Sequence, residues 1–403
     1  MIGRPSLSII IPTKNRIQYL IPCVKKLMDI QSGDVEIVVH DNSDNKIAMT
    51  DIMSLRNYSN LHYIHCADKL SMAENFERGL ESSSGEYITF IGDDDGVNPE
   101  IIDALTWAKR EGLDALVGCS AASYDWPDVV SKFYGKRFSG MLTISHFSGK
   151  VVYPEPLNEI YYCLRTAGYG FARLPKSYHG IVKREYMDMV FQKAGTYFPG
   201  PTPDMSNAVA LACIIKRYAY IDYPLFISGH GRTSGGGAGA ENMHDWSLQS
   251  APWFSQRAVS IWSDMVPKFC CGETLWAVDV IQALQAMGCD NLIIHFNKTF
   301  LYARCVVFYK HHNQLTFDMI YRFMGKDVLS RLRTAISFTY YYLWTWAQRL
   351  GSLLKNIFRL CKTCNNQQAS NLKDIGHAMD SLKRVLRLKC YYFDKEVGPC
   401  KKC

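Results

Sequence analysis

The stretch Tyr87-Ile88-Thr89-Phe90-Ile91-Gly92-Asp93-Asp94-Asp95-Gly96 joins a short apolar run to three consecutive carboxylates. Its first half is rich in isoleucine and aromatic residues, which is typical of a buried strand. Adjacent carboxylates repel one another, and a protein keeps such a cluster most readily when a cation neutralises it. The stretch therefore predicts a buried strand with a charged site at its carboxyl end. The alternative is an acidic surface turn capped by Gly96.

Similar apolar runs recur along the first half of the chain, and segments with helical spacing separate them. The runs are Leu7–Ile11, Val35–Val39, Leu61–His65 and Ala115–Val117. Helical spacing is visible in Met72, Phe76 and Leu80, and again in Ile101 to Ala108 behind Pro99. This alternation predicts an α/β fold with a mostly parallel sheet and helices on both of its faces.

Polar residues follow three of the expected strands directly. They are Pro12–Arg16, His40–Asp44 and Gly92–Gly96. Open parallel sheets bind ligands at the carboxyl ends of their strands, so these stretches are expected to line one site.

The three carboxylates suggest a metal site. Alternate residues of an extended chain point to opposite sides, so Asp93 and Asp95 are expected on a common side, with Asp94 facing elsewhere. Hard oxygen ligands favour Mg²⁺ or Mn²⁺, and either ion can bridge a diphosphate.

Together, Ser8–Arg16, Val38–Ser43 and Phe90–Asp95 resemble the family 2 glycosyltransferases, which have the GT-A fold. The resemblance covers roughly Ser6 to Ala238. It implies a Rossmann-like, mostly parallel sheet and an inverting, metal-dependent enzyme. Such an enzyme moves a sugar from a nucleotide-diphosphate donor, with a UDP-sugar as the first choice, to a saccharide or lipid-linked glycan acceptor in surface polysaccharide synthesis.

The resemblance also assigns roles at the donor site. It implies that Pro12, Thr13 and Arg16 line the nucleotide pocket, together with Asp93 and Asp94. Asp41 would contact the donor base, where a carboxylate can accept the N3 hydrogen of uracil. Asn75 would touch the ribose or the acidic cluster. An Asx turn remains the alternative for Asp41, and a solvated helix face the alternative for Asn75.

Inverting transfer needs a general base to take the proton from the acceptor hydroxyl. Similar enzymes place this acid at the start of a helix downstream, and Asp204 follows Gly200-Pro201-Thr202-Pro203 in that way. A plain helix N-cap is the alternative. Further along, Gly229–Gly235 resembles a loop that closes on the diphosphate. In it, His230 would join Asp95 and Asp93 around the metal, and Arg232 would contact the donor.

The chain is expected to divide into a GT-A domain at residues 1–240, a helical region at 241–360 and a basic, cysteine-bearing tail at 361–403. From Arg331 onwards, fourteen Lys and Arg face only four Asp and Glu, while the preceding part is slightly acidic. This asymmetry points to an anionic surface, either acidic lipid or nucleic acid, or simply to a soluble basic tail. We favour lipid because Ile336–Trp346 is rich in Tyr and Trp, although a buried aromatic helix is the alternative.

The N-terminal apolar run Leu7–Ile11 is shorter than the apolar core of a signal peptide. The expected location is therefore the cytoplasm, at the inner face of the cell membrane. Two Cys-x-x-Cys pairs, at Cys361–Cys364 and Cys400–Cys403, leave open a zinc site or unliganded thiols.

Two other functions remain open. A sugar nucleotidyltransferase would want a glycine-rich loop after the first strand, and Pro12–Arg16 lacks glycine. A non-catalytic, membrane-bound scaffold with a degenerate fold would have no need of the acidic triplet or Asp204.

Overall fold

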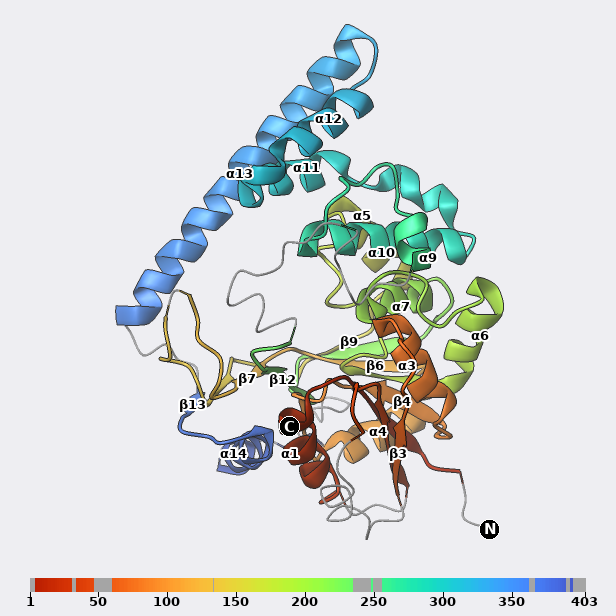
Figure 1. The fold of residues 1–403 in the computed structure, drawn as a ribbon, viewed down its shortest axis with the longest axis vertical. Coiled ribbons are helices and arrows are strands. Elements are labelled where there is room, and N and C mark those ends of the chain that lie inside the picture. Colours follow the sequence, from red (N-terminus) through yellow and green to blue (C-terminus); the bar gives the residue numbers. More distant parts are fainter. Residues whose placement is uncertain are drawn as a thin grey trace, which may run out of the picture.

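The computed structural model describes residues 4–30, 34–46, 60–132, 134–234, 248, 256–361, 367–388 and 392–393. In Figure 1 a part built around β-sheets lies below a group of helices, and one long helix runs along the outside of that group. The predicted α/β fold with a helical C-terminal region is confirmed. The helices beside the sheets are α1 (Ile17–Leu27), α3 (Met72–Glu81), α4 (Ile101–Arg110), α6 (Arg184–Ala194), α7 (Pro203–Ala212) and α14 (Ile375–Leu388). Helix α5 (Pro156–Arg165) instead packs in the core of the helical unit described below.

The larger sheet has eight strands. In spatial order they are β3 (Leu61–His65), β2 (Val35–Asp41), β1 (Leu7–Thr13), β4 (Tyr87–Phe90), β10 (Gly180–Lys183), β6 (Ala115–Gly118), β11 (Tyr218–Ile221) and β9 (Val151–Val152). Strands β3, β2, β1 and β4 are parallel neighbours, as the sequence predicts. The sheet is mixed further along, because β10 runs antiparallel to both β4 and β6.

Both faces of this sheet are covered, which explains why its strands read as continuous apolar runs. In β1, Ile9 and Ile11 join a core cluster that includes side chains of α1, α4 and α14. Their neighbour Ile10 points into a second cluster, with side chains of α6 and α7. Helix α3 begins at a capping box formed by Ser71 and Glu74, and its Phe76 stacks on Phe90 of β4 at 5.1 Å between ring centroids.

A second sheet has five strands, in the order β13 (Gln367–Ala369), β8 (Met141–Ile144), β7 (Ala122–Asp125), β12 (Phe226–His230) and β5 (Gly96–Val97). Its edge strand β13 comes from the far end of the chain, and α14 follows it. Buried side chains of α14, including Ile375 and Met379, join the same core cluster as β1 and α1. Residues 367–388 are therefore part of the N-terminal core, although the sequence led us to expect a separate tail from residue 361.

The helical unit, residues 256–361, has its own core. Its helices are α9 (Gln256–Ser260), α10 (Gly272–Ala286), η1 (Asp290–His295), α11 (Lys298–Phe308), η2 (Lys310–His312), α12 (Asn313–Phe323) and α13 (Val328–Cys361). Helix α7 links the two cores. Met205 and Val209 pack against the helical unit, while Ala210 and Leu211 pack against the larger sheet.

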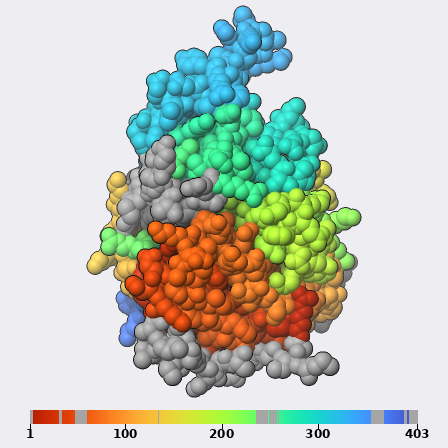
Figure 2. All heavy atoms as spheres, turned by 45° about the vertical axis from the view of Figure 1, so that its right-hand side comes forward, coloured from red at the N-terminus to blue at the C-terminus, as the bar shows by residue number. Residues whose placement is uncertain are grey.

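The aromatic stretch Ile336–Trp346 lies in α13 and divides between core and surface. Phe338, Tyr341 and Trp344 pack against the core of the helical unit. Ile336, Tyr340 and Leu343 are each 61% exposed. One face of the helix is therefore buried in the core of the helical unit, as the alternative interpretation expects, and the other face is exposed. Contact with a membrane stays a prediction. Figure 2 shows that the segment around residues 310–340 stands out from the body of the molecule. Of the two Cys-x-x-Cys pairs, Cys364, Cys400 and Cys403 lie outside the described residues.

Candidate active site

The three carboxylates lie in a tight turn, Gly92–Asp95, between β4 and β5. We call this segment the acidic turn. Its backbone closes with a hydrogen bond from Asp95 N to Gly92 O at 3.2 Å. The residues Asp93, Asp94 and Asp95 are 1%, 3% and 2% exposed, so the alternative of an acidic surface turn is excluded. Buried charges of this kind need close partners.

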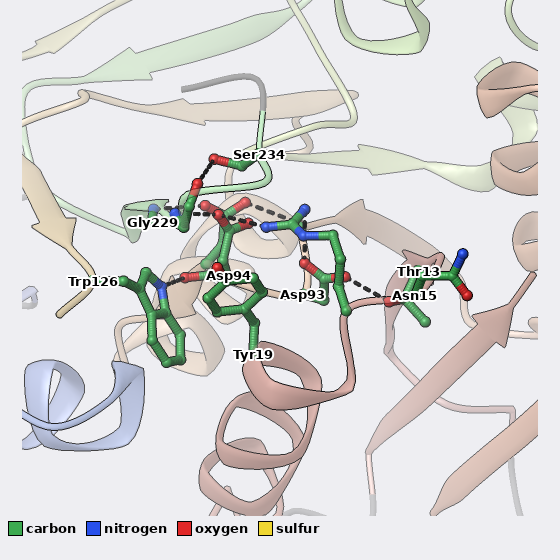
Figure 3. Close-up of polar contacts among 12 residues, drawn as sticks. Thr13, Asn15, Tyr19, Asp93, Asp94, Trp126, Gly229 and Ser234 are labelled. Atoms are coloured by element: carbon green, nitrogen blue, oxygen red, sulfur yellow. Dashed lines mark hydrogen bonds and ion pairs between the residues drawn. The ribbon is translucent and has the colours of Figure 1, made fainter. Parts of the chain in front are cut away.

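Arg16 supplies one such partner for the first two carboxylates. Its guanidinium lies 3.0 Å from Asp93 Oδ1 and 2.9 Å from Asp94 Oδ2, and it stacks 4.8 Å above the ring of Tyr19. Thr13 donates its hydroxyl to Asp93 Oδ2 at 2.5 Å. Figure 3 shows Thr13 of β1, Tyr19 of α1, and Asp93 and Asp94 of the acidic turn close to one another. Burial raises the pKa of Asp93 to about 7, despite the opposing effect of Arg16.

Asp95 faces away from Arg16, and both of its carboxylate oxygens are occupied. Oδ2 accepts the backbone N–H of Gly92 at 2.7 Å and the Tyr178 hydroxyl at 2.6 Å, and lies 2.8 Å from His179 Nε2. Oδ1 accepts the backbone N–H of Gly229 at 2.7 Å. Burial opposes ionisation, but His179 and these donors hold the pKa of Asp95 well below its usual range.

The prediction that Asp93 and Asp95 share one side is therefore wrong. Asp93 and Asp94 share Arg16, and Asp95 points to Tyr178 and His179. The alternation rule applies to extended chain, whereas these residues lie in a turn.

Backbone N–H groups at the end of strand β12 bind the carboxylates of the acidic turn. Gly229 N binds Asp95, and Gly231 N donates to Asp94 Oδ2 at 2.8 Å, while the Trp126 indole N–H donates to Asp94 O at 3.0 Å. A Cβ at Gly229 would lie 1.7 Å from Asp94 O, so only glycine permits this approach. In the sequence, the glycines of Gly229-His230-Gly231 are the feature that indicates this close approach of the two backbones.

The predicted loop residues His230 and Arg232 neighbour these two glycines in the chain. His230 Nδ1 lies 2.8 Å from Asp125 Oδ1, and this contact raises the pKa of His230 against the opposing effect of burial. Its ring is thus engaged with Asp125 of β7. Arg232 is exposed in the turn that follows β12. The glycines from Gly235 onwards lie outside the described residues up to 247.

The donor-side residues cluster at the ends of β1 and β2, as the sequence predicts. Thr13 is paired in register with Asp41, and Pro12 with His40. Asn75 donates to Thr13 O at 3.1 Å and accepts from His40 Nδ1 at 2.6 Å, which rules out a solvated face.

Asp41 accepts the backbone N–H of Ser43 at 2.9 Å and the Tyr63 hydroxyl at 2.6 Å. The bond from Ser43 is the Asx-type contact offered as its alternative role. Contact with a donor base stays a prediction for this residue.

Asp204 lies in the first turn of α7 and is half-buried. The N-cap of that helix is Thr202, so Asp204 is not the cap. Its charge acts on Tyr178, whose pKa is raised chiefly by burial and then by Asp95, Asp94 and Asp204. Tyr178 thus contacts Asp95 of the acidic turn and also feels the charge of Asp204. Neither Tyr178 nor His179 lies in one of the strand-end motifs that predict the site. The one sequence feature that could have indicated them is the polar run Lys176–His179 directly before the buried strand β10.

A metal ion at the acidic turn would share Asp93 and Asp94 with their present partners Thr13, Gly231 and Arg16. Asp93 Oδ1 is buried and has no hydrogen-bond partner, so it faces only the Arg16 guanidinium. Asp95 has both oxygens in hydrogen bonds, and His230 pairs with Asp125. Within the described ranges, no three His, Cys, Asp or Glu side chains form a group that could hold a metal. The predicted set of Asp95, Asp93 and His230 is thus not assembled, and the cationic group beside Asp93 and Asp94 is the Arg16 guanidinium.

Comparison with known proteins places these motifs in a family. Residues 8–146 match the family model described as Glycosyl transferase family 2. The chain is 28% identical over 116 residues to the GalNAc(5)-diNAcBac-PP-undecaprenol beta-1,3-glucosyltransferase of Campylobacter jejuni. The aligned residues cover 28% of this chain and 38% of that protein. It is 32% identical over 124 residues to the glycosyltransferase YibD of Escherichia coli, covering 30% and 34% of the two chains. The chain thus spans well under half the length of these curated relatives.

Among solved structures, S. aureus TarS 1–349 in complex with UDP-GlcNAc aligns with a TM-score of 0.47 and 16% identity, over 86% of this chain and 92% of that one. The motifs at the ends of β1, β2 and β4 lie inside the matched residues 8–146. Residues 8–146 of the chain thus match glycosyltransferase family 2.

Proposed function

We propose that this protein is an inverting glycosyltransferase that moves a sugar from a nucleoside-diphosphate donor to a glycan acceptor. The observation that carries the proposal is the buried pair Asp93 and Asp94 around Arg16, at the carboxyl end of β4 and beside the ends of β1 and β2. Ligands of open α/β sheets bind at this edge. The nucleotide would lie over Thr13 and Asp41, with its diphosphate toward Arg16.

The reaction we propose is a single displacement. Asp204 takes the proton of the acceptor hydroxyl as that oxygen forms a bond to the anomeric carbon. The bond from the anomeric carbon to the diphosphate oxygen breaks in the same step, and the nucleoside diphosphate leaves with the electron pair. Arg16 lies where it can exchange its contacts with Asp93 and Asp94 for the charge of the diphosphate.

We propose UDP-sugars as donors and Mg²⁺ or Mn²⁺ as the metal, held by Asp93 and Asp94. When bound, such an ion supplies positive charge against the diphosphate. A lipid-linked glycan acceptor is suggested by the name of the Campylobacter relative, which acts on an undecaprenol-linked glycan.

The test is a panel of UDP-glucose, UDP-galactose, UDP-N-acetylglucosamine, UDP-N-acetylgalactosamine and GDP-mannose, each with and without Mn²⁺. Thermal shift measures binding, and release of nucleoside diphosphate measures turnover with water as the acceptor. We expect at least one donor to stabilise the protein and to be hydrolysed. Release of pyrophosphate from a nucleoside triphosphate and a sugar phosphate would favour the nucleotidyltransferase. Binding without turnover under any condition would favour the scaffold.

Asp94 provides a direct test of the metal assignment. We expect Asp94→Asn to remove most of the gain in donor affinity that Mn²⁺ gives, because the variant keeps the hydrogen bond from Gly231 but loses the negative charge. Calorimetric titration of the donor with and without Mn²⁺ measures the gain. Asp125→Asn is the matched control, because Asp125 pairs with His230 and contacts neither Asp93 nor Arg16. An unchanged Mn²⁺ effect in Asp94→Asn would reject the assignment.

We also propose that α13 holds the enzyme on an anionic membrane surface. Val328–Cys361 contains five Lys and Arg and no Asp or Glu. Its exposed face carries Leu329, Leu332, Ile336, Leu343 and Leu350. A positively charged helix with exposed apolar side chains is complementary to acidic lipid, whereas a second copy would present like charge. In the part of the chain that the structure describes, no helix is long and apolar enough to cross a membrane.

Flotation with liposomes tests this attachment. We expect the wild type to float with phosphatidylglycerol-containing vesicles more than with neutral ones, and Leu332→Glu/Ile336→Glu/Leu343→Glu to stay in solution. Ile294→Glu is the control, since Ile294 is 84% exposed but lies in η1. Truncation before Arg331 is unsuitable, because it would remove α14 from the N-terminal core. Equal flotation of the wild type and the triple variant would refute the proposal.

A further inference from the structure

Helix α10 brings a buried carboxylate to the start of α7. Asp279 is 0% exposed, in the middle of α10. Its Oδ1 accepts the backbone N–H of Thr202 at 2.9 Å, and its Oδ2 contacts the Thr202 hydroxyl. A buried carboxyl group is costly unless hydrogen bonds satisfy it, and Thr202 supplies two. Burial raises the pKa of Asp279 well above its usual range, with a smaller contribution from Asp204.

Because of this contact, the Thr202 side chain does not cap helix α7. As the N-cap of α7, a threonine would normally accept a hydrogen bond from the first turn of the helix. Here its side chain makes no such bond and points to Asp279 instead. Gly200 allows the approach, because a Cβ there would lie 2.4 Å from Asp279 Oδ1. The turn before α7 is thus built around the Asp279 carboxyl group.

Asp204 depends on that turn for its position. It lies two residues after Thr202, in the first turn of α7, and its charge acts on Lys176 and Tyr178. The backbone of this turn carries the Asp204 side chain. Thr202 begins that turn, and the hydrogen bonds from its backbone N–H and its hydroxyl to Asp279 hold it in place.

We propose that Asp279 is a positioning residue, which orients Asp204 toward the acceptor through Thr202 and so makes the helical unit part of the active site. The proposal rests on the proposed function, in which Asp204 is the base. It goes beyond that function because it assigns a role in turnover to a helix outside the family-matched residues 8–146. A misplacement of a catalytic group by about 1 Å can cost a hundredfold in rate.

The experiment compares Asp279→Ala, Asp279→Asn and Gln282→Ala, in the full chain, with the UDP-sugar that the wild type hydrolyses fastest. Asn can accept the N–H of Thr202 and donate to its hydroxyl, so it can rebuild both contacts. Gln282 is the matched control, because it is a buried polar residue of the same helix and donates to Ile261 O at 3.1 Å. The measurements are kcat and KM per folded enzyme, with the folded fraction taken from circular dichroism.

We expect Asp279→Ala to lower kcat roughly ten- to a hundredfold with little change in the donor KM. Asp279→Asn should stay within a few-fold of the wild type, and Gln282→Ala should lose stability without losing kcat. If Asp279→Ala does not fold, Thr202→Val decides, since it removes only the hydroxyl contact and should still lower kcat.

A kcat for Asp279→Ala or Thr202→Val equal to that of Gln282→Ala would overturn the proposal, and so would an Asp279→Asn variant as slow as the alanine variant. These outcomes differ from a failure of the proposed function. In that case the wild type would hydrolyse no nucleotide sugar, or Asp204→Asn would be fully active.

Discussion

Asp204→Asn is expected to lower turnover by about two to four orders of magnitude, with little change in donor affinity. The asparagine keeps the shape of the side chain but cannot take a proton from the acceptor hydroxyl. Because Thr202, not Asp204, is the N-cap of α7, the loss of stability should be small, about 0.3–1 kcal/mol from the helix dipole. Steady-state kinetics and a donor titration measure the two effects.

Glu185→Gln is the matched control for Asp204→Asn. Glu185 is an exposed acid in the first turn of α6, so its neutralisation has the same kind of effect on a helix terminus. It should leave turnover unchanged. If Asp204→Asn turned over normally and lost only stability, Asp204 would be a structural residue and the base would have to be sought elsewhere.

Asp95→Ala is expected to destabilise the fold by about 3–5 kcal/mol, the cost of breaking a buried, paired charge. The substitution leaves the N–H groups of Gly92 and Gly229, the Tyr178 hydroxyl and His179 Nε2 without their acceptor. The sequence suggested that Asp95 is a metal ligand, whereas these hydrogen bonds indicate a structural role.

Denaturant unfolding measures this difference, with Asp94→Asn as the comparison variant. Asp94→Asn should lose less stability than Asp95→Ala, because the asparagine oxygen can still accept from Gly231 and Arg16 keeps its pair with Asp93. A stable Asp95→Ala that had lost only its metal-dependent donor binding would restore the original assignment of Asp95 to the metal.

Much of the sheet could be predicted from the sequence. Strands such as β1 and β2 are buried along their whole length, so they read as unbroken apolar runs, and ligand-binding residues follow their carboxyl ends. Strand ends in a parallel sheet meet at one edge, so the sequence could predict which side chains lie close together there. The structure brings together four of them, Thr13, Arg16, Asp93 and Asp94.

The orientation of each carboxylate could not be predicted. It depends on the turn that follows β4 and on donors from residues far along the chain, such as Tyr178 and Gly229. The return of β13 and α14 was missed for a similar reason. Contacts such as Tyr124 OH to Leu372 O join residues 248 positions apart, and no local periodicity records them. Asp279 likewise appeared only as one polar residue in an apolar helical segment.

The measurement that tests the central claim most directly is proton NMR of the sugar released from an α-linked UDP-sugar, recorded before mutarotation, with parallel detection of UDP. An inverting transferase that uses water as the acceptor should release the β-anomer first, together with one UDP per sugar, and Asp204→Asn should abolish both signals. Release of the α-anomer would contradict single displacement, and release of UMP with sugar phosphate would contradict glycosyl transfer.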